Sequence, residues 1–362
     1  MSGSFAVEYS LPGRIGRELR MAEETLEAVA QALVAPGKGI LAADESTGTI
    51  EKRLRSIEVE STEENRRAYR EMLFTTAGLG DHISGVILFD ETIRQSTKDG
   101  VPFTKVLVDA GVIPGIKVDK GAKALAGAED EKVTEGLDGL RERLVEYRGM
   151  GAKFTKWRAV IDIGKDRPSA YCIHVNAHAL ARYAALSQEA GLVPIVEPEV
   201  LMDGTHTIER CYEVTEATLE AVFNELFSQR VLYERMLLKP NMVISGKECA
   251  EQAGPERVAE ATVRCFKSVV PAAVPGIVFL SGGQSDEQAT ANLNAINALG
   301  RQPWQLSFSY GRALQAPSLK AWRGDDANVH AGQDALAHRA RMNGAARDGS
   351  YSPDMEKELA PA

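Results

Sequence analysis

Eight short apolar segments, spaced along most of the chain, are the sequence feature that most restricts the possible fold. They are Gly39–Ala43, Ile83–Phe89, Ile113–Val118, Phe154–Ile161, Leu192–Glu197, Met236–Val243, Gly276–Leu280 and Trp304–Ser309. Between most of them lie good helix formers with apolar residues about 3.6 positions apart, as in 169–190, 207–226, 256–269 and 286–299. Strands that alternate with helices form a parallel sheet in an α/β fold, and eight strands favour a closed (β/α)8 TIM barrel over an open, doubly wound sheet.

No low-complexity linker divides the chain, so we expect the whole sequence to form a single barrel domain. An arm over residues 1–14 and a helix over 15–34 are expected to precede the first strand. The glycine-rich, acidic segment 119–138 is predicted to be a surface excursion. Residues 325–362 are predicted to form a helix followed by a polar tail from about residue 350.

Charge and cysteine content exclude several classes of protein. The 362 residues carry a formal net charge of -9, which argues against a general nucleic-acid binder. No run of about 18 apolar residues occurs and the first ten residues lack a signal pattern, so we expect no membrane partner. The four cysteines form no Cys-x-x-Cys pair, which indicates free thiols in a reducing compartment. We therefore expect a cytoplasmic protein.

Lys239 stands out because it interrupts the apolar segment Met236–Val243. Lysine is seldom fully buried, and burial favours the neutral amine, which can attack a carbonyl carbon and form a Schiff base. On its own, the sequence Leu-Leu-Lys-Pro is better explained by a lysine at a strand end whose ammonium reaches water. The other charged residues of the predicted barrel reverse that preference.

Charged residues recur at the carboxyl ends of the predicted strands, where TIM barrels build their active sites. They are Asp44, Lys117, Asp119, Lys156, Arg158, Glu197, Glu199 and Lys239. Because residues two apart in a strand share a face, the predicted sets are Lys156 with Arg158, Glu197 with Glu199, and Lys239 with Leu237 and Asn241. Any one of these charges could form a structural salt bridge, but all of them together do not fit an apolar barrel core.

The types of these residues suit carbon–carbon cleavage next to a carbonyl. A neighbouring cation such as Lys156 would further favour the neutral amine of Lys239. Glu197 could deliver and remove the protons of carbinolamine formation and dehydration. Asp44, across the barrel, could take a proton from a substrate hydroxyl.

Two glycine-containing loops predict a phosphate site. Leu280-Ser-Gly-Gly-Gln-Ser285 and Ser309-Tyr-Gly-Arg312 follow the seventh and eighth predicted strands, and each leads into a helix. Glycines let backbone N–H groups approach an anion, helix N-termini favour negative charge, and arginine binds phosphate bidentately. We predict one phosphate at Ser281, Gly282, Gly283, Ser309, Gly311 and Arg312. On the opposite rim, Ser46, Thr49, Lys52, Arg53 and Lys117 could hold a second, so the substrate would carry phosphate at both ends.

The chain closely resembles class I fructose-bisphosphate aldolases, the metal-free, Schiff-base type, from about Ile15 to Tyr351. The matching motifs are Gly39-Ile-Leu-Ala-Ala-Asp-Glu-Ser-Thr-Gly48, Gly115-Ile-Lys-Val-Asp-Lys-Gly121, Lys156-Trp-Arg158, Ile195-Val-Glu-Pro-Glu-Val200, Leu237-Leu-Lys-Pro-Asn-Met242, Phe279-Leu-Ser-Gly-Gly-Gln-Ser285 and Phe308-Ser-Tyr-Gly-Arg-Ala-Leu-Gln315. The resemblance implies reversible cleavage of fructose 1,6-bisphosphate into dihydroxyacetone phosphate and glyceraldehyde 3-phosphate, in glycolysis and gluconeogenesis. It also implies a homotetramer, with neither a metal nor another cofactor.

The resemblance further implies a role for each matching residue. Lys239 would form the imine, Glu197 would be the main acid and base, and Glu199 and Lys156 would support that site. Asp44 would handle the C4 hydroxyl. The ketose C1 phosphate would be held by Ser281, Gly282, Ser309, Gly311 and Arg312, and the far phosphate by Ser46, Thr49, Arg53 and Lys117.

Two departures from the family pattern concern Thr49 and the C-terminus. Thr49 stands where the animal enzymes commonly have serine, and the hydroxyl is kept. The animal and plant enzymes end in a tyrosine thought to help proton transfer at the enamine stage, whereas this chain ends in Glu356-Lys-Glu-Leu-Ala-Pro-Ala362. Tyr351 matches an upstream tyrosine of the family, so that role is not transferred to it.

Other interpretations predict different behaviour. His174 and His178 are four residues apart in a predicted helix, a spacing that can bind a metal, but no third histidine or nearby carboxylate is expected to join them. A metal-dependent barrel aldolase would lose activity in chelator. Transaldolase shares the lysine chemistry but does not need two phosphate sites. A non-catalytic scaffold that binds acidic protein segments, and a preference for fructose 1-phosphate or sedoheptulose 1,7-bisphosphate, stay as alternatives.

Overall fold

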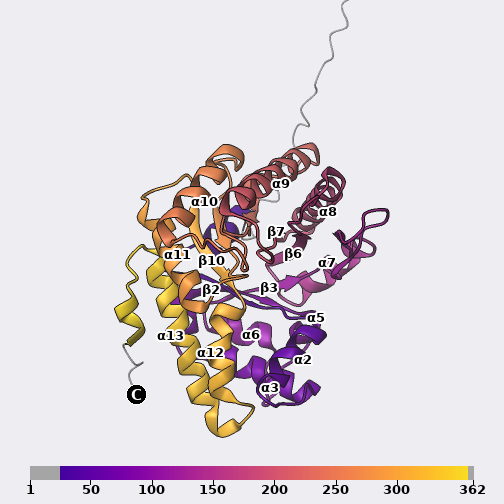
Figure 1. Cartoon of the computed structure of the whole chain (residues 1–362). Helices are drawn as coiled ribbons and strands as arrows, with labels where there is room; N and C mark the ends of the chain where they lie inside the picture. Colours follow the sequence, from indigo (N-terminus) through magenta and orange to yellow (C-terminus); the bar gives the residue numbers. More distant parts are fainter. Residues whose placement is uncertain (1–24, 358–362) are drawn as a thin grey trace, which may run out of the picture.

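The computed structural model describes residues 25–357, and its centre is a closed barrel of eight parallel strands with helices around it (Figure 1). The strands are β1 (Gly39–Ala43), β2 (Ile83–Leu88), β3 (Ile113–Lys117), β6 (Phe154–Ile161), β7 (Val193–Val200), β8 (Leu237–Leu238), β9 (Gly276–Phe279) and β10 (Gln305–Tyr310). They are hydrogen-bonded in the order β1-β10-β9-β8-β7-β6-β3-β2. The predicted TIM barrel is confirmed.

The helices that cover the barrel begin where the sequence offers a cap. Ser169, Thr207 and Ser285 each accept a hydrogen bond from a backbone N–H in the first turn of α8, α9 and α11. The helices are α1 (Leu26–Leu33), α2 (Thr47–Arg55), α3 (Glu63–Phe74), α4 (Leu79–His82), α5 (Asp90–Ile93), α6 (Phe103–Asp109), α7 (Leu140–Gly149), α8 (Ala170–Glu189), α9 (Ile208–Ser228), α10 (Pro255–Val269), α11 (Asp286–Ala298), α12 (Arg312–Trp322) and α13 (Val329–Arg347). Short 3-10 turns η2 (Tyr233–Arg235), η3 (Asp326–Asn328) and η4 (Pro353–Lys357) lie between or after them.

Two predicted strands differ from the observed ones by more than one residue at an end. The segment 236–243 keeps only Leu237–Leu238 in the sheet, because Pro240 has no backbone N–H to continue the ladder. Beyond it, Asn241 bonds with Thr215 of α9 (3.0 Å), so it points away from the interior and does not share the face of Lys239 as predicted. In contrast, β7 runs three residues past the predicted end and includes Glu199 in its ladder with β6.

The predicted excursion 119–138 contains a small antiparallel hairpin of β4 (Ala122–Ala124) and β5 (Lys132–Thr134). The predicted arm 1–14, the beginning of the predicted helix 15–34 and the last five residues of the tail lie outside the described residues. All four cysteines lie inside them and are free thiols, as predicted. Within 25–357, no helix is long and apolar enough to cross a membrane.

Helix α1 closes the end of the barrel at which the strands begin. Its Val29 and Leu33, together with Val34, form one buried cluster with inward-facing residues of the strands. Glycines make room for it: a Cβ on Gly85 would lie 2.6 Å from Leu33 Cδ2, and one on Gly276 would lie 2.6 Å from Val34 Cγ1. The floor of the barrel is therefore filled by a helix, and the opposite end is left for chemistry.

Replacement of Gly115 by alanine should destabilise the barrel floor. The new Cβ would lie 2.3 Å from the ring of Phe154, which is fully buried in the same floor, so strand and ring must both shift. Overpacking of this kind costs about 1–3 kcal/mol, measured as the free energy of unfolding in urea. Gly149→Ala in α7 is the matched control, because no atom lies within 4 Å of the position that its new Cβ would take. Equal stability of the two variants would contradict a tightly packed floor.

Candidate active site

A cavity of about 820 Å³ opens at the carboxyl ends of the barrel strands. Lys52 and Gly283 do not line it, and the other fifteen predicted residues do: Asp44, Ser46, Thr49, Arg53, Lys117, Lys156, Arg158, Glu197, Glu199, Lys239, Ser281, Gly282, Ser309, Gly311 and Arg312. The strands bring these residues together from segments more than 250 positions apart in the chain. The sequence-predicted polar set is therefore one concave site.

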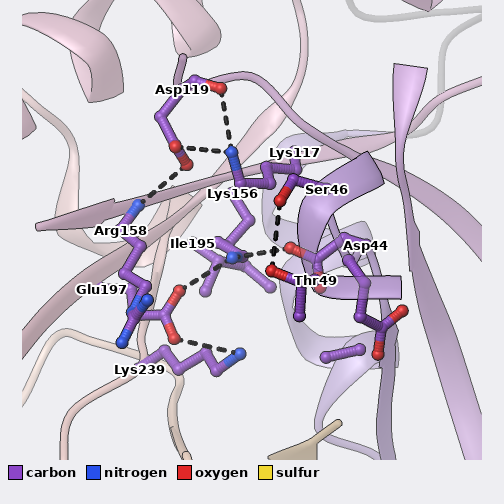
Figure 2. A network of polar contacts seen from close by, with 12 residues as sticks. Asp44, Ser46, Thr49, Lys117, Asp119, Lys156, Arg158, Ile195, Glu197 and Lys239 are labelled. Carbon is purple, nitrogen blue, oxygen red and sulfur yellow. Dashed lines mark hydrogen bonds and ion pairs between the residues drawn. The ribbon is translucent and has the colours of Figure 1, made fainter. Parts of the chain in front are cut away.

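A chain of ion pairs crosses the bottom of this cavity (Figure 2). Lys239 Nζ, just after β8, lies 3.2 Å from Glu197 Oε1 on β7. Lys156 Nζ on β6 lies 3.1 Å from Glu197 Oε2 and 2.7 Å from Asp44 Oδ2 after β1. The four side chains are almost completely buried, so each charge depends on its neighbours for solvation.

Burial and the two lysines act in opposite directions on the carboxylates. Burial alone would raise the pKa of Glu197 and of Asp44, but attraction by Lys156 and Lys239 outweighs it and holds both pKa values below their ordinary range. For Lys156, burial lowers the pKa, yet the negative charges of Asp44 and Glu197 outweigh burial and raise it. Lys156 therefore stays a cation and both carboxylates stay ionised at neutral pH.

Two buried polar atoms of the site have no hydrogen-bond partner within the described chain. They are Ser309 Oγ, at the end of β10, and Glu197 Oε2, whose contact with Lys156 lacks hydrogen-bond alignment. Buried polar atoms are normally satisfied by hydrogen bonds, so both atoms are available to a polar ligand or to water in the cavity. Glu199, two residues after Glu197 on β7, is ion-paired with Arg158, whose side chain also lines the cavity.

The rim formed by α2 and β3 carries hydroxyl and cationic groups. Ser46 Oγ and Thr49 Oγ1 lie 3.1 Å apart at the start of α2, and Arg53 follows one turn later. Lys117, at the end of β3, completes this rim. Hydroxyls and cations around a helix N-terminus suit the binding of an anionic group.

The opposite rim is built by the loops after β9 and β10. Gly311 brings its backbone close to β1, since a Cβ there would lie 3.2 Å from Ala42 O. Arg312, the first residue of α12, donates to the backbone carbonyl of Gln284 and so joins the two loops. Gly283 does not line the cavity itself: it has a positive φ of 79°, and a Cβ on it would lie 2.7 Å from Met202 Cβ, so its phosphate contact stays a prediction.

Several residues that contact and support the predicted site residues were not identified from the sequence. Glu45 is buried and ion-paired with both Arg53 and Arg70, and it accepts a hydrogen bond from Gln315 Nε2 (2.8 Å). Its position next to Asp44 was the available signal. Asp119 is one of the predicted strand-end charges but not one of the predicted site residues, although it lines the cavity. Arg143 reaches the cavity from α7, and no local pattern marks it.

His174 and His178 of α8 lie near a carboxylate, which was not expected from the sequence. Glu225 of α9 lies 3.1 Å from His178 Nδ1 and 3.8 Å from His174 Nδ1, because α8 and α9 pack side by side. The expectation that no carboxylate joins these histidines is therefore wrong. Even so, among residues 25–357 no group of three or more His, Cys, Asp or Glu side chains is arranged to hold a metal ion.

Comparisons with known proteins show the family of the chain. A family model described as "Fructose-bisphosphate aldolase class-I" matches residues 25–361. A protein of Xanthomonas campestris pv. campestris, named probable fructose-bisphosphate aldolase class 1, is 64% identical over 91% of this chain and 99% of its own length. Cytosolic fructose-bisphosphate aldolase 4 of Arabidopsis thaliana is 56% identical over 92% of this chain and 85% of its own.

A solved structure extends the likeness to the fold. Fructose-bisphosphate aldolase of Plasmodium falciparum, solved in complex with TRAP and a small-molecule inhibitor, is 52% identical to this chain. It superposes with a TM-score of 0.90 and covers 90% of this chain and 95% of its own.

Proposed function

The chain belongs to the class I fructose-bisphosphate aldolase family, and from this premise we propose how its cavity carries out the reaction. The enzyme is a lyase that cleaves fructose 1,6-bisphosphate reversibly into dihydroxyacetone phosphate and glyceraldehyde 3-phosphate, through the lysine Schiff base of its class. The observation that supports the residue assignments best is the buried ion-pair chain from Lys239 through Glu197 and Lys156 to Asp44.

In the proposed first stage, Lys239 attacks the ketose carbonyl. Its Nζ gives a proton to Glu197, 3.2 Å away, and the neutral amine adds to C2 to form a carbinolamine. Glu197 then returns the proton to the leaving hydroxyl, so that water departs and the imine forms. Lys156 keeps Glu197 in place, and its positive charge stabilises the oxyanion that develops at C2.

In the second stage, Asp44 takes the proton of the C4 hydroxyl while the C3–C4 bond breaks. The bonding electrons move to the imine and give an enamine, and the aldehyde product leaves. Protonation of the enamine at C3 and hydrolysis of the imine then release dihydroxyacetone phosphate and free Lys239. Asp44 suits this role because its pKa is held low by Lys156 and Lys239 despite burial, which leaves it ionised to accept the proton.

The two rims would bind the two phosphates. Ser281, Gly282, Ser309, Gly311 and Arg312 are proposed to hold the C1 phosphate. Ser46, Thr49, Arg53 and Lys117 are proposed to hold the far phosphate, with Arg158 and Glu199 at the mouth between them. A scaffold function is not favoured, because Lys239, Glu197, Lys156 and Asp44 are all present and joined by ion pairs. No observation favours a preference for sedoheptulose 1,7-bisphosphate.

Three expectations about the whole protein stay proposals. We propose one domain, a homotetramer and a cytoplasmic location. The cytosolic and cytoplasmic names of the plant relatives support the location. Light scattering after size exclusion would test the tetramer.

Reductive trapping tests the proposed mechanism. Borohydride added to the enzyme with dihydroxyacetone phosphate, in excess chelator, should fix one ligand per chain, and peptide mass spectrometry should find it on Lys239. Turnover in the same chelator should equal turnover without it. A label on another lysine, or loss of turnover in chelator, would overturn the assignment, and a reaction without dihydroxyacetone phosphate is the control.

A further inference from the structure

We propose that Asp119 is a positioning residue that fixes Lys117 for the far phosphate and thereby sets the preference for a bisphosphate over a ketose 1-phosphate. The inference rests on the proposed function, in which Lys117 holds that phosphate. Asp119 itself need not touch the substrate.

The carboxylate of Asp119 is the centre of a small network at the end of β3 (Figure 2). Lys117 Nζ donates to Asp119 Oδ1 at 2.6 Å and to Asp119 O at 3.0 Å. The backbone N–H groups of Gly121 and Arg158 donate to the two carboxylate oxygens at 3.0 and 3.3 Å. One side chain therefore ties the lysine to the next loop and to the neighbouring strand β6.

Asp119 is fixed more firmly than the lysine that it holds. Its side chain is 2% exposed, whereas that of Lys117 is 15% exposed and lines the cavity. The segment that follows β5 covers Asp119, since a Cβ on Gly136 would lie 3.3 Å from Asp119 Cα. Arg143 ties the same layer together by donating to Val118 O (2.8 Å) and Gly136 O (2.5 Å).

These hydrogen bonds fix the position of the Lys117 ammonium group. A free lysine side chain has four rotatable bonds, and ordering it costs up to about 2 kcal/mol of rotamer entropy when a ligand binds. Asp119 takes up two of the three Nζ donors before the substrate arrives and leaves one for a phosphate oxygen. Preorganisation of this kind strengthens binding by removing the ordering cost from the binding step.

Substrate selectivity separates positioning from general support of the fold. Fructose 1-phosphate has no far phosphate, so it does not use Lys117, while every other step stays the same. In Asp119→Asn, the ratio of kcat/KM for fructose 1,6-bisphosphate to that for fructose 1-phosphate should fall about tenfold or more, mainly through KM, because one charge-assisted contact is weakened. Asp109→Asn, which removes an exposed carboxylate in α6, should leave the ratio unchanged.

A double variant shows whether Asp119 acts through Lys117. Lys117→Met should lower the same ratio, and Asp119→Asn added to it should lower the ratio no further. An equal loss for both substrates, or an additional fall in the double variant, would overturn the proposal. If Asp119→Asn does not fold, Asp119→Glu keeps the charge but displaces Nζ, and the same selective loss is expected. Failure of borohydride trapping at Lys239 in the wild-type enzyme would instead overturn the proposed function.

Discussion

Lys239→Met is expected to lower kcat by about 10⁴-fold or more while the barrel stays folded, because the variant lacks the amine that is proposed to attack the carbonyl. Lys156 is the nearest alternative, but it is held between Asp44 and Glu197 as a cation. Glu197 keeps Lys156 as a partner in the variant, so its charge stays compensated. Steady-state cleavage measures the loss, and thermal unfolding checks the fold.

Lys105→Met is the matched control for this variant. Lys105 is exposed in α6 and, among residues 25–357, forms an ion pair with Asp109 one turn away, so its loss should change neither turnover nor stability noticeably. The Lys239→Met variant should also fail to retain dihydroxyacetone phosphate on reduction. Turnover by Lys239→Met above about a hundredth of the wild-type rate would show that another group forms the covalent bond.

Lys156→Met should damage both turnover and stability. It leaves Asp44 and Glu197 as two buried carboxylates without their shared cation, and loss of one partner of a buried pair costs about 3–5 kcal/mol. Turnover should fall by about 10³-fold, because Glu197 loses its orientation and the oxyanion its nearest cation. Chemical denaturation and kcat measure the two effects, again with Lys105→Met as the control.

The stability difference between wild type and Lys156→Met should depend on pH. In the wild type, Asp44 and Glu197 have pKa values below their ordinary range, so their contribution to stability is present above about pH 4 and is lost as the pH falls through the folded-state values. The variant lacks most of this contribution. The difference should therefore be largest near neutral pH and shrink below about pH 4; a difference that is constant from about pH 7 to about pH 3 would contradict the ion-pair account.

The barrel could be predicted from the sequence because its strands are buried on both faces and therefore read as continuous apolar runs. Gly39–Ala43 and Phe154–Ile161 have the predicted bounds. Apolarity does not reveal where hydrogen bonding stops, so the sequence predicts Met236–Val243 as one strand although the ladder ends at Leu238, ahead of Pro240. Pro240 is a local signal for the end of that ladder, whereas the extension of β7 to Val200 depends on its pairing with β6, which the local sequence does not show.

The site could be predicted where a charge breaks an apolar strand, as at Lys156, Glu197 and Lys239. Contacts between side chains of separate elements gave no such signal, whether or not they support the site. Arg70 of α3 contacts Glu45 only after α3 packs against the barrel, and Glu225 meets His178 only through the packing of α8 on α9. The two residues of each contact are separated in the sequence by 25 positions (Glu45 and Arg70) and by 47 positions (His178 and Glu225), so the contacts form only in the tertiary fold.

The helix-filled floor has a consequence for redesign of this enzyme. Glycines on separate strands make space in this floor, and each glycine lies against one larger side chain, as Gly115 does against Phe154 and Gly276 against Val34. A library that varies one position at a time would reject nearly every enlargement there. Reciprocal exchanges, in which a glycine gains a methyl while its partner is trimmed, offer a route to altered sequences at that pole without disturbing catalysis at the other.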